Sequence, residues 1–531
     1  MKRILLNGVW EFGFAADDGR IVYDSLSSVP GCFDTRSGEF GKRQRAGFKR
    51  QVTVSGGDLM LTLDACGLHT QVCWDGVCLA SDDLPYSRQE IIVRNAAAGE
   101  HTLEIITDNF LTGDPAEQFK SFYDFYGYGG IYGDVSLTEF SPGDLRKVEV
   151  IPLDYRDGSV EIRTEAFDET PEYLHISFDG KEFSKMPYQE KFVCQVPSFK
   201  VWSVEEPNLH TMNINGTEAV FGIRTIDYSG KELKLNGKPL KLIGCNRHEA
   251  HPESGPATGN ALTLNDLLMI KQQGFNFIRG SHYPQKEFML DMCDKLGLLV
   301  WEEALAWGNK AEEFECEKFV ARQQEACRRM VKKSINHPSV IIWGFLNECA
   351  SDQECVRDTI ASLRSEIRQL DISRPAAFAS NRPDLDISFD HSDIIAINIY
   401  PGWYDTPDTP VDGIDRVKPT LKKYAEKFAD INKPLIVSEI GAAALRGDHS
   451  GYRWSEDYQS RLLTAVLDGI FEFERYTGTA LWLFCDTKSY LETGFSFTRP
   501  RGFNNKGMLD EYRRPKMAWH DVHKFLKNKG F

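Results

Sequence analysis

The pattern of predicted secondary structure changes once, near residue 230, and this change constrains the fold more than any other feature. Before it, helical periodicity is almost absent, and alternating runs such as GEHTLEIITDNF lie between glycine and aspartate turns. After it, strand-like runs alternate with amphipathic helical segments. Strands that alternate with helices predict βα units and a parallel sheet.

Residues 230–531 predict a (β/α)8 TIM barrel. Eight strand-like runs fall in this segment, from KLIGCNRH (241–248) through AAFAS (376–380), the fifth, to TALWLFCDT (479–487). Eight βα units in this length match an α/β barrel, which takes about 250 residues. An active site is therefore expected at the carboxyl ends of the strands.

The residues before the barrel predict two β-sandwiches. Residues 1–141 turn often and contain little but short β-type runs. In residues 142–229 such runs recur about every ten residues, which suits a small immunoglobulin-like β-sandwich. The predicted protein is multidomain, with boundaries near residues 141 and 229.

Composition excludes several classes of partner. The net charge of −16 argues against nucleic acid and anionic membranes, although a locally basic pocket could still bind an anionic substrate. The first apolar run stops at Asn7, too early for a signal peptide, and no run of about 18 apolar residues follows. The twelve cysteines show no zinc spacing, and RHEAH lacks the HExxH spacing. We expect a cytoplasmic protein without metal or cofactor.

Two carboxylates end predicted barrel strands. The apolar run HPSVIIWGFLNE stops at Asn347 and Glu348, and KPLIVSEIG places Glu439 at the end of the seventh strand. Glycoside hydrolysis needs such a pair, because one carboxyl protonates the leaving oxygen while the other attacks or directs water. Strands four and seven lie on opposite sides of a barrel mouth, so these side chains could face each other across a sugar. Aromatic residues at other strand ends, including Tyr400, would stack on the sugar.

The motifs GCNRHE, RGSHYP, HPSVIIWGFLNE, INIYPGWY, IVSEIG and LWLF together resemble glycoside hydrolase family 2 over nearly the whole chain. That resemblance implies a jelly-roll β-sandwich (1–141), an immunoglobulin-like β-sandwich (142–229) and a catalytic TIM barrel (230–531). It also implies that Glu348 is the acid/base and that Glu439 is the nucleophile of a retaining mechanism. Asn347 would bind the sugar 2-hydroxyl.

Within the family, NIYPGWY and FNNKG (503–507) resemble the β-glucuronidase branch. The N-x-K motif of that branch implies that Asn504 and Lys506 hold the sugar carboxylate, and an ammonium with an amide donor is a charge-assisted clamp for an anion. The same resemblance implies sugar contacts from four further side chains: Asp124, His248, Tyr404 and Trp482.

The chain departs from that branch in three places. HPESG (251–255) resembles the β-galactosidase branch, Leu483 stands where the family has asparagine, and the loop after EEALAWGN is short. A short loop leaves room for an oligosaccharide leaving group. The expected function is exo-hydrolysis of terminal β-D-glucuronides or β-D-galacturonides. A neutral β-galactosidase is the first alternative, and an inactive carbohydrate-binding protein is a distant one; a homo-oligomer is possible.

Several of these residues have ordinary structural interpretations. Asp124 could be a solvated loop carboxylate, Lys506 a surface charge, and Trp403 either core or sugar platform. Arg499 and Arg501, beside the N-x-K motif, are expected at the surface rather than in the site, with the alternative that one of them supports the bound anion. His282 and Tyr283 could be packing residues of the barrel mouth.

Overall fold

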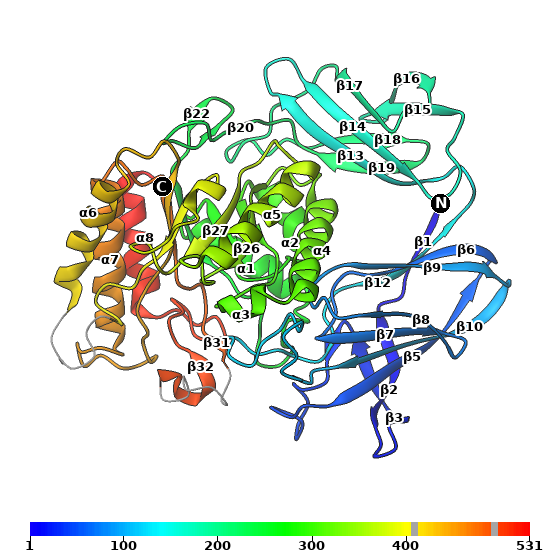
Figure 1. Ribbon diagram of the computed structural model, residues 1–531, viewed down its shortest axis with the longest axis horizontal. Helices are drawn as coiled ribbons and strands as arrows, with labels where there is room; N and C mark the ends of the chain where they lie inside the picture. Colours follow the sequence, from blue (N-terminus) through cyan, green and yellow to red (C-terminus); the bar gives the residue numbers. More distant parts are fainter. Residues whose placement is uncertain (405–412, 490–497) are drawn as a thin grey trace.

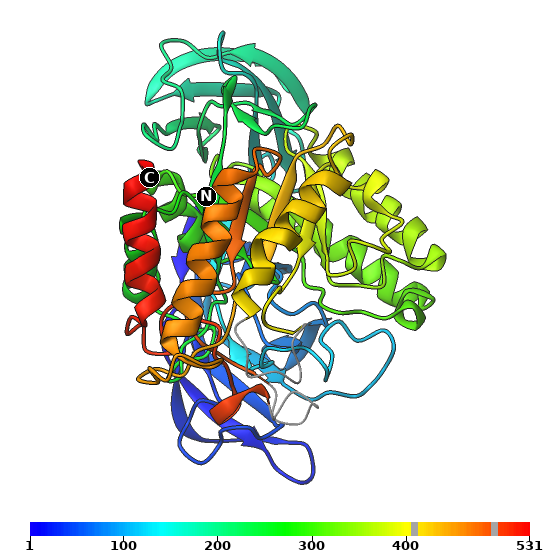
Figure 2. The same ribbon diagram turned by 90° about the vertical axis from the view of Figure 1, so that its left-hand side faces the viewer.

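The computed structural model describes residues 1–404, 413–489 and 498–531, and it confirms the predicted fold class (Figure 1). Two antiparallel sandwiches lie on one side of a closed parallel barrel. A quarter turn of the view places the second sandwich above the barrel and the first below it (Figure 2). The domain limits at residues 141 and 229 stay a prediction.

The first sandwich packs a six-stranded sheet against a four-stranded one. Leu59, Leu61 and Leu63 of one sheet and Leu103 and Ile105 of the other are fully buried. Burial of alternate residues is expected where each strand turns one face to the core. In spatial order the strands are β3 (Ile21–Val29), β2 (Gly8–Ala15), β5 (Arg45–Val54), β10 (Gly99–Asp108), β7 (His69–Trp74) and β8 (Val77–Asp82), then β1 (Lys2–Leu5), β12 (Val135–Phe140), β6 (Gly57–Leu63) and β9 (Gln89–Ala96), with β4 (Gly31–Cys32) paired to β11 (Gly130–Ile131).

The second sandwich has a three-stranded and a four-stranded sheet around its own core, which includes Val150, Ile162, Ile176 and Met212. A small three-stranded sheet joins it to the barrel. The strands are β13 (Leu145–Asp154), β14 (Ser159–Ala166) and β17 (Lys191–Gln195), then β16 (Lys181–Pro187), β15 (Tyr173–Phe178), β18 (His210–Ile214) and β19 (Thr217–Phe221), and in the joining sheet β20 (Ile226–Asp227), β21 (Lys234–Leu235) and β22 (Lys238–Pro239).

The barrel closes through eight parallel strands that are buried on both faces, as their continuous apolar runs predict. At the amino-terminal ends of the barrel strands, Trp202 packs against Leu242, Phe277 and Leu299. Trp202 lies between β17 and β18 of the second sandwich, is fully buried and donates from Nε1 to the Asp294 carbonyl at 2.9 Å. The strands are β23 (Leu242–Asn246), β24 (Phe277–Gly280), β25 (Leu299–Glu303), β26 (Val340–Asn347), β27 (Ala376–Ser380), β28 (Ile395–Asn398), β29 (Leu435–Ile440) and β30 (Gly478–Leu481).

Amphipathic helices cover the outside of the barrel. In the longest, α4 (Glu317–Ser334), Phe319, Gln323 and Cys327 are buried at the helical period. No helix in the described ranges is long and apolar enough to cross a membrane. The other helices are α1 (Asn260–Gln272), α2 (Glu287–Leu296), α3 (Ala311–Phe314), α5 (Glu354–Leu370), α6 (Val417–Lys427), α7 (Glu456–Glu472) and α8 (Met517–Lys529).

An aromatic cluster fixes the first sandwich against the open, carboxyl-terminal mouth of the barrel. The rings of Tyr86 and Tyr283 stack with centroids 4.0 Å apart and planes 12° apart. Tyr123 and Phe125, in the loop between β10 and β11, are buried in the same cluster. Asp124 lies between them in the chain, so packing of its two neighbours carries this carboxylate to the mouth.

Candidate active site

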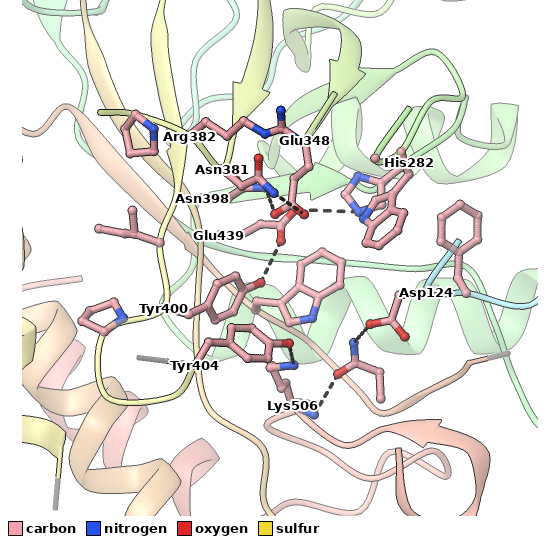
Figure 3. A pocket seen from close by; sticks show the side chains of 18 of the residues that line it. Asp124, His282, Glu348, Asn381, Arg382, Asn398, Tyr400, Tyr404, Glu439 and Lys506 are labelled. Atoms are coloured by element: carbon pink, nitrogen blue, oxygen red, sulfur yellow. Dashed lines mark hydrogen bonds and ion pairs between the residues drawn. The ribbon is translucent and has the colours of Figure 1, made fainter. Parts of the chain in front are cut away.

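A cavity of about 680 Å³ lies at the carboxyl ends of the barrel strands (Figure 3). Its wall contains nine of the ten side chains predicted from the sequence; Asn347 lies behind it. These residues come from the first sandwich and from five barrel strands or the loops after them, together with the segment that follows the barrel. The nine are Asp124, His248, Glu348, Tyr400, Tyr404, Glu439, Trp482, Asn504 and Lys506.

Glu348 directly follows β26 with a left-handed backbone, φ 54°, and its N–H donates to the Ala379 carbonyl at 2.8 Å. A non-glycine residue in this conformation is uncommon and is found in tight turns and at functional sites. Asn398 Nδ2 donates to Glu348 Oε1 at 2.9 Å. Burial, and next the negative charge of Glu439, raise the pKa of Glu348 to about 8. Glu348 is therefore protonated at neutral pH and can supply a proton.

Glu439 has the opposite surroundings, because cationic and neutral donors point at both oxygens. Arg279 Nη1 donates to Oε1 and the Tyr400 hydroxyl donates to Oε2, each at 2.7 Å. Charge-assisted hydrogen bonds of this kind fix the orientation of the carboxylate. The two carboxyls therefore have unlike environments.

Arg279, within β24, was not predicted as a site residue, although it belongs to the quoted motif RGSHYP. It is fully buried and also donates to Glu303 Oε1 and to Asn347 Oδ1, both at 2.7 Å. Asn398, at the end of β28, was missed as well. A charged or amide side chain in an otherwise apolar strand was the available signal in both cases.

Asn347 is fully buried, and its orientation is fixed from both sides. Its Oδ1 accepts from Arg279 and, at 3.0 Å, from Asn398 Nδ2. Its Nδ2 has no hydrogen-bond partner within the described part of the chain. The fixed amide thus retains one unused donor next to the two carboxyls.

Lys506 lies at the far end of the cavity and is 1% exposed, so it is not a surface charge. Its Nζ donates to the Tyr404 hydroxyl at 2.7 Å, and across the described ranges no carboxylate forms an ion pair with it. Burial lowers its pKa from the ordinary lysine value. Asn504, in the short strand β32 (Phe503–Asn504) that pairs with β31 (Thr487–Lys488), is also buried and lies beside Lys506.

The prediction that Arg499 lies at the surface was wrong. Arg499 is 3% exposed and forms a bidentate ion pair with Asp124, whose carboxylate also accepts from Asn504 Nδ2 at 3.0 Å and from the Ser489 hydroxyl. Burial would raise the pKa of Asp124, but Arg499 outweighs it and keeps that pKa low. The contact joins the first sandwich to the segment after the barrel, a pairing that local sequence could not show. Arg501 does lie at the surface, paired with Glu511.

Aromatic rings form another part of the wall. His248 stands edge-on to Trp482, with ring centroids 5.5 Å apart, and burial holds the pKa of His248 well below its usual range. His282 stacks on Trp482 and its Nδ1 bonds Glu303 at 2.9 Å, so His282 belongs to the site rather than to packing alone. Trp403 is 3% exposed and is absent from the wall, which assigns it to the core.

One group of side chains elsewhere has metal-ligand spacing within the described residues: Glu287, Asp291 and His337. His337 Nδ1 bonds Asp294 at 2.6 Å, and its Nε2 lies 3.4 Å from Glu287. Burial would lower the pKa of His337, but these carboxylates raise it to about 10. A charged imidazolium at this place satisfies the carboxylates and repels a cation.

A family model described as "Glycosyl hydrolases family 2, TIM barrel domain" matches residues 226–528, more than half of the chain. The chain belongs to glycoside hydrolase family 2. This family 2 enzyme is 27% identical to a β-glucuronidase of Streptococcus agalactiae, over 78% of this chain and 73% of the relative. It is 26% identical to a β-glucuronidase of Paenibacillus borealis, over 87% and 84%.

Among solved structures, a family 2 β-galacturonidase from Eisenbergiella tayi bound to galacturonate is 30% identical to the enzyme. The two superimpose with a TM-score of 0.90 over 99% of this chain and 97% of that one. The sequence prediction of a glycoside hydrolase similar to β-glucuronidases and β-galacturonidases is confirmed.

Proposed function

We propose that the enzyme removes terminal β-D-hexuronides, glucuronides or galacturonides, with net retention at the anomeric carbon. The observation that carries this proposal is Lys506, a buried ammonium without an ion-pair partner in the described chain. A buried charge is costly unless it is paired. The carboxylate of a uronic acid would supply the missing partner, whereas a neutral sugar would not.

The wall suggests how the sugar lies. Its carboxylate would meet Lys506, Asn504 and the Tyr404 hydroxyl at one end of the cavity, and its anomeric carbon would lie beside Glu439. Trp482 would border the apolar face of the ring. Asp124, held next to Asn504, would meet a ring hydroxyl near the carboxylate end.

In the first step, protonated Glu348 gives its proton to the glycosidic oxygen while Glu439 attacks the anomeric carbon and the bond to the leaving group breaks. Arg279 and Tyr400 orient the attacking carboxylate. The free Nδ2 of Asn347 would bind the 2-hydroxyl, a contact that strengthens in the transition state.

In the second step, Glu348 must act as a base. The charge of Glu439 is one cause of the raised pKa of Glu348, and this charge disappears when Glu439 is esterified to the sugar. The pKa of Glu348 then falls, so its carboxylate can take a proton from the water that attacks the anomeric carbon. The sugar leaves with its original configuration.

The similar proteins support a uronide but differ at carbon 4. The curated relatives are β-glucuronidases, whereas the structural neighbour at 30% identity is a β-galacturonidase bound to galacturonate. Both sugars carry the carboxylate that Lys506 requires, so the clamp alone does not discriminate between them.

The decisive experiment compares kcat/KM for four β-linked 4-nitrophenyl glycosides: glucuronide, galacturonide, galactoside and glucoside. We expect the two uronides to dominate, and their ratio assigns the preferred configuration at carbon 4. Dominant galactoside hydrolysis would refute the anion clamp and support the β-galactosidase alternative. Proton NMR of the first sugar released tests retention, which predicts the β anomer before mutarotation.

A further inference from the structure

The cavity continues beyond the two carboxyls, on the side away from Lys506. Six side chains from the loop after β27 and from α6 line this part, and we refer to them as the outer rim. None of them was predicted from the sequence. The outer rim consists of Asn381, Arg382, Pro383, Thr420, Lys423 and Tyr424.

The position of Glu348 indicates which part of the substrate the outer rim would contact. An acid that protonates the glycosidic oxygen must lie beside the bond to be broken, so it marks the boundary between the sugar and the leaving group. Asn381 Nδ2 reaches Glu348 Oε2 at 3.4 Å. Figure 3 shows Asn381 and Arg382 on one side of the carboxyls and Tyr404 and Lys506 on the other. The outer rim therefore occupies the leaving-group side.

The chemistry of the outer rim is polar. It presents the amide of Asn381, the guanidinium of Arg382, the hydroxyl of Thr420 and the ammonium of Lys423. Its one ring, Tyr424, is 7% exposed, so it offers almost no face for a flat aromatic group to stack on.

The two cations of the outer rim are anchored from behind. Arg382 is ion-paired with Asp352, and Lys423 lies 2.6 Å from Asp384; neither carboxylate is part of the cavity wall. These contacts hold the donors in place and offset their charge. Anchored, charge-compensated donors suit the hydroxyls of a neutral sugar, which need several hydrogen bonds and no net charge.

We propose that the outer rim is a binding subsite for a sugar leaving group, so that the enzyme releases a terminal uronide from an oligosaccharide. This inference rests on the proposed function. Asn381, next to the acid, would bind the hydroxyl adjacent to the glycosidic oxygen. Arg382, Thr420 and Lys423 would bind hydroxyls further out on the same sugar.

The test uses two substrates with the same terminal uronide. One is the 4-nitrophenyl uronide, and the other is a disaccharide in which the uronide is β-linked to a neutral hexose. The variants are Arg382→Ala and Thr420→Ala, because neither side chain contacts Glu348 or Glu439 in the described structure. Dividing the kcat/KM of each variant by that of the unmodified enzyme, substrate by substrate, removes the difference in leaving-group reactivity.

We expect Arg382→Ala to lower kcat/KM about tenfold on the disaccharide and less than about twofold on the aryl uronide, since one hydrogen bond to a charged donor is lost. The matched control is Arg357→Ala, because Arg357 is also an arginine paired with an aspartate, Asp390, but lies outside the cavity. It should change neither substrate. The melting temperatures of Arg382→Ala and Arg357→Ala should be nearly unchanged, because the ion pairs that they remove are partly exposed.

Equal losses on both substrates, or unchanged disaccharide hydrolysis in both rim variants, would overturn the subsite. If the unmodified enzyme hydrolyses neither uronide, the proposed function itself fails. Activity on the aryl uronide combined with no turnover of the disaccharide leaves the function intact and refutes the sugar leaving group.

Discussion

Replacement of Lys506 by methionine removes the charge of the proposed clamp and keeps most of the side-chain volume. Lys506 is 1% exposed, and its ammonium donates to a neutral hydroxyl, that of Tyr404. Solvent screening of a bound carboxylate is therefore small at this depth. Removing one member of such a buried pair costs about 2–5 kcal/mol. This corresponds to a loss of about 30- to 4,000-fold in uronide binding.

The same reasoning predicts an unusual effect on stability. Because Lys506 has no ion-pair partner in the described chain, Lys506→Met removes a desolvated charge and should leave the melting temperature unchanged or raise it. Lys516 is a useful contrast, because its buried ammonium lies 2.8 Å from Asp486. Lys516→Met should lower the free energy of unfolding by about 3–5 kcal/mol, since it leaves a carboxylate buried and unpaired.

The assay measures inhibition constants of free glucuronate and galacturonate against those of glucose and galactose, together with kcat/KM on the aryl uronides. The affinity of the uronates for the Lys506→Met variant should fall by about 30- to 4,000-fold, and that of the hexoses by less than about threefold. An equal loss for acids and hexoses, or a marked fall in melting temperature, would show that Lys506 is a structural residue.

Three further predictions follow from the site. Glu439→Gln should reduce turnover to background with unchanged circular dichroism, and rapid hydrolysis by this variant would exclude its nucleophile role. In the unmodified enzyme kcat/KM should fall as the pH rises through about 8, because Glu348 must carry its proton; with the aryl uronide, Glu348→Gln should remove this alkaline limb. The folded-state pKa of Glu348 is raised, so its contribution to stability is lost as the pH rises through that value, and Glu348→Gln should gain more in melting temperature at pH 9 than at pH 5. Asp124→Ala should lower the free energy of unfolding by about 1.5–3 kcal/mol, because it removes the charge-assisted hydrogen bonds that Arg499 donates to this carboxylate. In a denaturant titration, the loss in Asp124→Ala combined with Arg499→Ala should be smaller than the sum of the two single losses.

The two carboxyls were predictable because strand ends carry a local signal. A continuous apolar run that stops at Glu348, and another that stops at Glu439, indicate both the barrel strands and their carboxyl ends. The N-x-K motif similarly drew attention to Asn504 and Lys506, which lie on the cavity wall as expected.

The contacts of Arg279 were not predictable in this way, and neither were the positions of Arg499 and the outer rim, because they depend on partners far away in the chain. Arg279 bonds Glu439, 160 residues later, and Arg499 bonds Asp124, 375 residues earlier. In a single sequence an arginine in a polar loop is most simply a surface residue, and only burial against a distant carboxylate changes that interpretation.

The sequence by itself determined the succession of two sandwiches and a barrel, since side-chain periodicity is a local property that each strand and helix carries in its own residues. It also determined which carboxyls end the strands. Only the tertiary structure decided the protonation of Glu348, because its pKa depends on burial and on the charge of Glu439 across the barrel. It likewise decided that Lys506 is buried and has no carboxylate paired with it among the described residues, the feature on which the proposal of an anionic sugar rests.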